Sequence, residues 1–171
     1  ITVRNGYFTT AGGFNGGNIL LTAGVVTNCV ITGGHVEHTQ DSDIAGALGG
    51  NLYQTGGLAV DCDISKGNIY NVNGAGGGCN VVLHGSGRLM RCKVSGGYRT
   101  SGNIHSQWAS QSGGSGVYLN GGSCVIENCL VSGNSGAVSA LVLRNRAKAV
   151  NCTVAGNGEA AGKGGIWIAD D

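Results

Sequence analysis

The amino-acid sequence predicts an all-β protein in which short parallel strands coil around one hydrophobic core. The first observation behind this fold class is a five-fold repeat centred on cysteine, which indicates a repeat architecture. The second is the composition, because 35 of the 171 residues are glycine and none is proline. Glycine suits a chain that must turn sharply several times per coil. The glycines follow no three-residue period, so a collagen-like helix is excluded.

Each copy of the repeat follows one rule. An aliphatic residue stands three positions before the cysteine and a polar residue one before it. Ile or Val follows two positions later, and Ser, Thr or Ala three positions later. The copies are spaced by 33, 30, 37 and 23 residues. Alternation within a strand places the cysteine and the Ile or Val on one face. We expect an inward ladder of Cys29, Cys62, Cys92, Cys129, Cys152, Ile31, Ile64, Val94, Val131 and Val154.

A second strand is predicted ahead of each cysteine, in the segments 17–21, 50–53, 78–83, 116–119 and 138–143. Gly, Asn and Ser separate these strands, and no segment has a sustained apolar repeat at helical spacing. A strand pair of this kind cannot bury its apolar face alone, whereas stacked copies bury a continuous core. Successive strands then lie about 4.8 Å apart.

The last copy points to a known family. Residues 151–157 (Asn-Cys-Thr-Val-Ala-Gly-Asn) and 164–168 (Gly-Gly-Ile-Trp-Ile) resemble the repeat of right-handed parallel β-helix proteins. These proteins form the pectin-lyase-like superfamily, and the pattern is similar to its large bacterial secreted and surface members. The resemblance implies a right-handed parallel β-helix of about five to six rungs, located outside the cell or on its surface. The repeated residues build the coil, so they imply a fold rather than an activity.

The chain begins and ends within the pattern, at Ile1 and Asp171. We therefore expect residues 1–171 to be a single β-helix domain that is an excised segment of a longer solenoid. Natural solenoids protect their ends with polar caps, and uncapped ends permit end-to-end self-association through strand edges.

Charge and cysteine content exclude several classes of partner. Charged residues make up 11% of the chain and the net charge is +1, so we expect no nucleic-acid partner. No apolar stretch approaches the roughly 20 residues of a membrane span, so no membrane insertion is expected. The five repeated cysteines of the seven present are predicted to be buried free thiols, with a bridge between stacked neighbours left open. No CxxC pair exists, and neither a metal site nor a cofactor is predicted.

Three longer segments leave the repeat at the same point and should lie side by side on one flank. They begin at His35, Asn68 and Tyr98. Tyr and Trp rings stack on sugars while polar side chains reach hydroxyl groups, so the flank is a candidate site for a polysaccharide or cell-surface glycan. The candidate residues are Tyr70, Tyr98, Arg99, His105, Trp108, His35, Asp41 and Asp43. The alternative is that these segments are solvated turns whose aromatic rings cover the coil beneath.

The resemblance also raises the question of catalysis. Lyases of this superfamily use acidic calcium ligands and an arginine base. Asp61 and Asp63 on one rung, with Arg91 and Lys93 on the next, come nearest to such a set. A cross-strand charge pairing explains them more simply. We therefore expect a structural or adhesin-like module of a larger secreted or surface protein, with no catalytic residues. The alternatives are a polysaccharide lyase or glycoside hydrolase, and a fibre module that stacks end to end.

Overall fold

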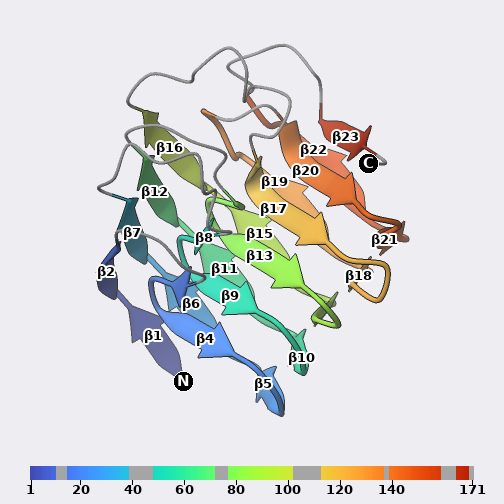
Figure 1. Ribbon diagram of the computed structural model, residues 1–171, viewed down its shortest axis with the longest axis horizontal. Coiled ribbons are helices and arrows are strands. Elements are labelled where there is room, and N and C mark those ends of the chain that lie inside the picture. The colour runs from blue at the N-terminus through green and yellow to red at the C-terminus, as the bar shows by residue number, and fades with distance from the viewer. Residues whose placement is uncertain are drawn as a thin grey trace.

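The computed structural model describes residues 1–10, 15–38, 48–71, 77–101, 113–136, 139–158 and 165–169. All regular structure in these ranges is β-strand, and every strand pair is parallel, so the predicted all-β class is confirmed. The stacked parallel sheets fit a β-solenoid, and successive coils follow one another along the molecule from the N-terminal to the C-terminal end (Figure 1). The described ranges contain no helix able to cross a lipid bilayer.

The chain visits four main sheets in a fixed order; sheets I to III continue through the C-terminal coils, whereas the described strands of sheet IV end with β16. Sheet I contains β4 (Ile19–Leu21), β9 (Leu52–Gln54), β13 (Val81–His84), β17 (Gly114–Asn120), β20 (Ser139–Arg144) and β23 (Ile166–Ala169). Sheet II contains β5 (Val25–Thr27), β10 (Leu58–Val60), β14 (Arg88–Met90), β18 (Val125–Glu127) and β21 (Lys148–Val150). The strand predicted ahead of each cysteine therefore lies in sheet I, and the beginning of each cysteine-centred stretch forms the next strand, in sheet II.

Sheet III contains β1 (Thr2–Arg4), β6 (Val30–Thr32), β11 (Asp63–Ser65), β15 (Lys93–Ser95), β19 (Leu130–Ser132) and β22 (Thr153–Ala155). Sheet IV contains β2 (Tyr7–Thr10), β7 (His35–His38), β12 (Asn68–Asn71) and β16 (Tyr98–Ser101). A small additional pair joins β3 (Asn15–Gly16) to β8 (Leu48–Gly49).

The main core lies between sheets I, II and III. One of its columns runs in register through sheet III and consists of Val3, Ile31, Ile64, Val94, Val131 and Val154. The four central members are inaccessible to solvent. Cys62, Cys92 and Cys129 pack in the same cluster with 3% exposure each. Each fully buried aliphatic side chain contributes about 1.5–3 kcal/mol to folding.

Each cysteine-centred stretch forms two strands rather than the single predicted strand. The residue before each cysteine has a left-handed backbone, with φ of 52° at Asn28, 55° at Asp61 and 48° at Arg91, and similar values at Asn128 and Asn151. A residue in this region turns the chain sharply, and asparagine is among the few non-glycine residues that enter it readily. The prediction of one strand was therefore wrong, and this corner carries the chain from sheet II to sheet III.

A second corner, from sheet III to sheet IV, is closed by glycine. A Cβ atom added at Gly34 would lie 2.2 Å from the carbonyl oxygen of Gly50, and one at Gly67 would lie 2.2 Å from that of Cys79. Gly97 meets the Ser115 carbonyl in the same way, at 2.3 Å. The segment that leaves sheet III thus touches the segment that returns to sheet I. We call this contact the pinch.

Buried asparagine side chains line the pinch in a hydrogen-bonded column. Asn51, which is inaccessible to solvent, accepts hydrogen bonds from the Gly34 amide at 2.8 Å and the Asn18 side chain at 2.7 Å. Its own amide donates to the Ser65 carbonyl and to the Asn80 side chain, both at 2.8 Å. The column continues from coil to coil through Asn18, Asn51, Asn80, Asn134 and Asn157.

Candidate glycan-binding face

The outward side chains of sheet IV form two registered columns. One contains Tyr7, His35, Asn68 and Tyr98, and the other contains Thr9, Glu37, Tyr70 and Thr100. Here we call these eight side chains the sheet IV face. The structure therefore places the beginnings of the three predicted flank segments side by side, on neighbouring strands of one sheet.

Aromatic rings dominate the exposed part of the sheet IV face. Tyr7 is 61% exposed and Tyr98 is 45% exposed. The rings of Tyr7 and His35 stack with centroids 5.0 Å apart and planes inclined by 6°. The Tyr7 hydroxyl donates a hydrogen bond to the Glu37 carboxylate, which fixes the ring against the next strand. The face thus presents flat rings beside polar groups.

Asn68 connects the strands in the middle of the sheet IV face. Its side-chain amide donates to the carbonyl of Tyr98 and to the hydroxyl of Thr100, at 3.2 Å each. Only 5% of Asn68 is exposed, so it acts mainly as a brace between β12 and β16. A braced backbone holds the neighbouring rings in fixed positions, and such preorganisation lowers the entropic cost of binding.

Arg99 does not share this face. Successive side chains of a strand point to opposite sides, and Arg99 belongs to the column of Phe8, Val36 and Ile69. Val36 and Ile69 are buried and form a small cluster of their own. Burial lowers the pKa of the Arg99 guanidinium. The sequence predicts that Arg99 reaches sugar hydroxyls beside Tyr98, but strand alternation places it on the opposite side of β16.

The outcome for the other candidate residues differs. His35, Tyr70 and Tyr98 come together on the sheet IV face. His105, Trp108, Asp41 and Asp43 lie outside the described residues. Sequence reasoning missed Tyr7 and Glu37, although a signal was available. Aligning Gly6 with Gly34 places Tyr7 beside His35, in the register that the strands adopt.

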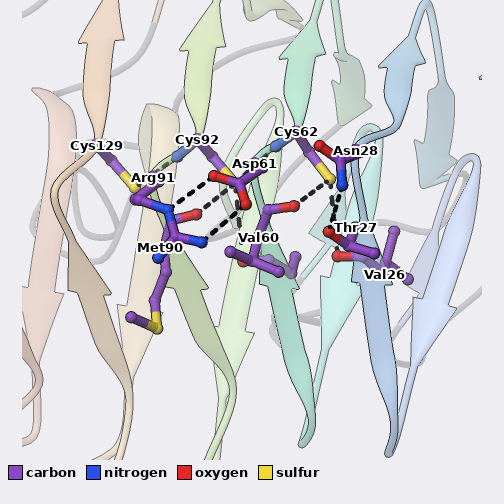
Figure 2. A network of polar contacts seen from close by, with 11 residues as sticks. Val26, Thr27, Asn28, Val60, Asp61, Cys62, Met90, Arg91, Cys92 and Cys129 are labelled. Carbon is purple, nitrogen blue, oxygen red and sulfur yellow. Dashed lines mark hydrogen bonds and ion pairs between the residues drawn. The ribbon is translucent and has the colours of Figure 1, made fainter.

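The charged corner shown in Figure 2 has a different character. The Arg91 guanidinium donates two hydrogen bonds of 2.8 Å to the Asp61 carboxylate of the previous coil. The predicted cross-strand pairing is confirmed for these two residues. The hydrogen bond from Arg91 holds the pKa of Asp61 below its ordinary value. The described residues contain no group of three or more His, Cys, Asp or Glu placed to hold a metal ion.

The cysteines form no disulfide bond, and Cys62, Cys92 and Cys129 lie next to this corner as free thiols. The backbone amide of Cys62 donates to the sulfur of Cys92 at 3.4 Å, and that of Cys92 donates to the sulfur of Cys129 at 3.3 Å (Figure 2). Burial raises the pKa of the Cys62 thiol, and it raises that of Cys79 to about 12. Because a thiol must ionise to act as a nucleophile, these cysteines are suited to packing rather than to reaction.

No model of a known protein family, no curated protein and no solved structure matches this chain. Its function must therefore be inferred from its own fold and side chains.

Proposed function

We propose that this chain is a right-handed parallel β-helix module of a larger secreted or cell-surface bacterial protein, and that it displays a glycan-binding face on a stiff coil. The sequence pattern of the pectin-lyase-like superfamily supports the family and the location. The hand is supported by a general rule, since connections between parallel strands of one sheet are right-handed in about 98% of cases.

Stiffness is supported by the way successive coils are joined. Strands of sheets I to IV pair in register along the coil, and the asparagine column adds side-chain hydrogen bonds at each pinch. Bending the coil would stretch many of these bonds together. A rod of this kind suits a spacer that holds a binding surface away from the cell.

The observation that carries the binding proposal is the exposure of Tyr7 and Tyr98 in one registered column of a braced sheet. Exposed tyrosine rings bury large areas at interfaces, and the hydrogen bond from the Tyr7 hydroxyl to Glu37 holds that ring in place. Sugar rings offer both an apolar face and hydroxyl groups, so they complement such a surface. Glu37 and Thr100 supply polar groups beside the rings.

The test is binding of the purified chain to an array of polysaccharides, with Tyr98→Ala as the variant. The control is Leu130→Ala, which removes a side chain of similar exposure from the outer face of sheet III. We expect wild-type protein and the control to bind alike and Tyr98→Ala to bind more weakly. Failure of the wild type to bind any glycan would reduce the proposal to a spacer. Absorbance from unsaturated uronides, released from polygalacturonate, would instead support the lyase alternative.

A further inference from the structure

The charge and spacing of the sheet IV face narrow the class of glycan. We infer that this face takes a neutral oligosaccharide whose chain lies across strands β2, β7, β12 and β16, parallel to the coil axis. The inference rests on the proposed glycan-binding function and specifies its ligand.

The charge of the sheet IV face disfavours an acidic glycan. Glu37 is the one Asp, Glu, Lys or Arg side chain among the eight residues of the sheet IV face. Lys66, two residues before Asn68, precedes β12 and belongs to the corner rather than to the sheet. Arg99 is on the opposite side of its strand. A uronate chain would therefore bring carboxylates to a surface with one carboxylate and no cation, and like charges repel.

The distance between the Tyr7 and Tyr98 rings sets the length of the glycan. Tyr7 and Tyr98 are in the same column, on the first and fourth strands of sheet IV. Strands are about 4.8 Å apart, so the two rings are separated by about 14 Å along the coil axis. A disaccharide is too short to contact both rings, whereas a chain of several sugars can. The His35 ring stacks on the Tyr7 ring, so one face of each is covered and the two rings meet a ligand as one unit.

The polar groups of β12 and β16 on the sheet IV face are uncharged. Asn68 and Thr100 bond to each other through two hydrogen bonds of 3.2 Å, and the Tyr70 hydroxyl belongs to the neighbouring column. The Thr100 and Tyr70 hydroxyls are uncharged and match the hydroxyls of a neutral sugar, while the buried Asn68 holds their strands in place. Specific recognition by such groups disfavours a ligand that leaves them unpaired.

The experiment is isothermal titration of the chain with cellohexaose, xylohexaose, mannohexaose and hexagalacturonate, followed by the corresponding disaccharides. We expect at least one neutral hexasaccharide to bind more tightly than hexagalacturonate, and more tightly than its own disaccharide. Its affinity should change little between low and high salt, since no ion pair forms. Tyr7→Ala and Tyr98→Ala should each weaken it by between about twofold and about tenfold.

Two matched variants sharpen the result. Glu37→Gln keeps the size of the side chain and an acceptor for the Tyr7 hydroxyl, and we expect hexagalacturonate to bind up to about fivefold more tightly to it. Leu130→Ala should leave every affinity unchanged. Circular dichroism and thermal melting of each variant establish that the coil is folded.

The outcomes separate the inference from the proposal beneath it. Tighter binding of hexagalacturonate than of every neutral hexasaccharide would overturn the neutral ligand but leave glycan binding in place. Equal affinity for a neutral disaccharide and its hexasaccharide would overturn the orientation along the coil. Absence of binding to all the oligosaccharides would overturn the inference and the glycan-binding function together.

Discussion

Asp61 and Arg91 occupy the same corner of successive coils, and the guanidinium of Arg91 bonds both carboxylate oxygens of Asp61 at 2.8 Å. Both side chains are largely exposed, so the pair contributes little to stability. Its clearest effect is electrostatic. The hydrogen bond from Arg91, with the charge of the guanidinium, lowers the pKa of Asp61 from its ordinary value of 3.8.

Arg91→Ala should raise the pKa of Asp61 toward its ordinary value, as measured by carbon NMR titration of the side-chain carboxyl group. The sign of the pH effect follows from the direction of the shift. A carboxylate with a lowered folded-state pKa stabilises the fold above its unfolded value, and that stability is lost as the pH falls through the folded value. An unchanged Asp61 titration in Arg91→Ala would contradict the bonded geometry.

Substitutions of Arg91 should separate the ion pair from the backbone. Arg91→Asn loses the ion pair but installs the residue found at the same corner in three other coils, so the free energy of unfolding should change little. Arg91→Val should cost about 1–2 kcal/mol, because a β-branched residue strongly resists the left-handed region.

Lys93→Val is the matched control for that comparison. It places the same residue two positions later, at an exposed position of strand β15, where valine is favoured. Urea unfolding of the three variants measures the differences. Equal losses in Arg91→Val and Lys93→Val would mean that the positive φ at Arg91 is not a constraint.

Asn51→Leu should destabilise the coil by about 1–3 kcal/mol, because the change leaves the Gly34 amide without an acceptor and an unpaired buried group costs that much. The Ser65 carbonyl and the Asn18 and Asn80 side chains each lose one hydrogen bond but keep another. Thermal melting is the measurement. A surface substitution in the same coil, Lys66→Ala, should melt close to the wild type.

Asn51→Asp should be destabilised in a pH-dependent manner. An ionised carboxylate cannot donate to Ser65 or Asn80, so the folded-state pKa of the new aspartate should lie above its unfolded value of about 3.9. A raised folded-state pKa means that stability is greatest in acid and falls as the pH rises through that interval. Thermal melting of Asn51→Asp and Asn51→Leu checks this prediction. The curves are recorded at intervals of about one pH unit, from roughly pH 3 to roughly pH 7.

Ile64→Ala should lower the free energy of unfolding by about 2–5 kcal/mol, because it leaves a cavity where a fully buried side chain packed. Asp63→Ala, one position earlier on the outer face of β11, should change stability by less than about 0.5 kcal/mol. Urea denaturation distinguishes the two. Equal effects would reverse the assignment of inner and outer faces.

The buried thiols should resist alkylation in the folded state. Burial raises the pKa of Cys79 to about 12, so its thiolate is scarce at neutral pH. Labelling with iodoacetamide should become complete only in denaturant, as followed by mass spectrometry of Cys79 and Cys124. Rapid labelling of the native protein at Cys79 would show that this part of the core opens readily.

The sequence predicted the strand ladders because their cause is periodic. Ile64 and Val94 are two positions after a cysteine in each coil, and alternation sends both to the core. The corner at Asp61 and Arg91 was not predicted, because arginine does not favour a positive φ and only Asp61 and the asparagines of other coils hint at it.

The sheet IV face was predictable in part. The common starting point of three segments indicated that His35 and Tyr98 lie together, since both follow a glycine-closed turn. The direction of Arg99 could not be read without the strand register. The asparagine column was hidden for a different reason: Asn51 and Asn80 precede sheet I, whereas Asn134 follows sheet III, so no single position in the repeat contains it.

The pinch also divides the chain into parts of constant and variable length. Segments that run from sheet I to sheet III span 19–32, 52–65, 81–95, 117–132 and 141–155, which is 14 to 16 residues. The intervening segments 33–51, 66–80, 96–116 and 133–140 span 8 to 21 residues. Longer connections cost little entropy once their ends are fixed. Natural variation or peptide grafting can therefore lengthen one such segment without disturbing the registration of the coils on either side.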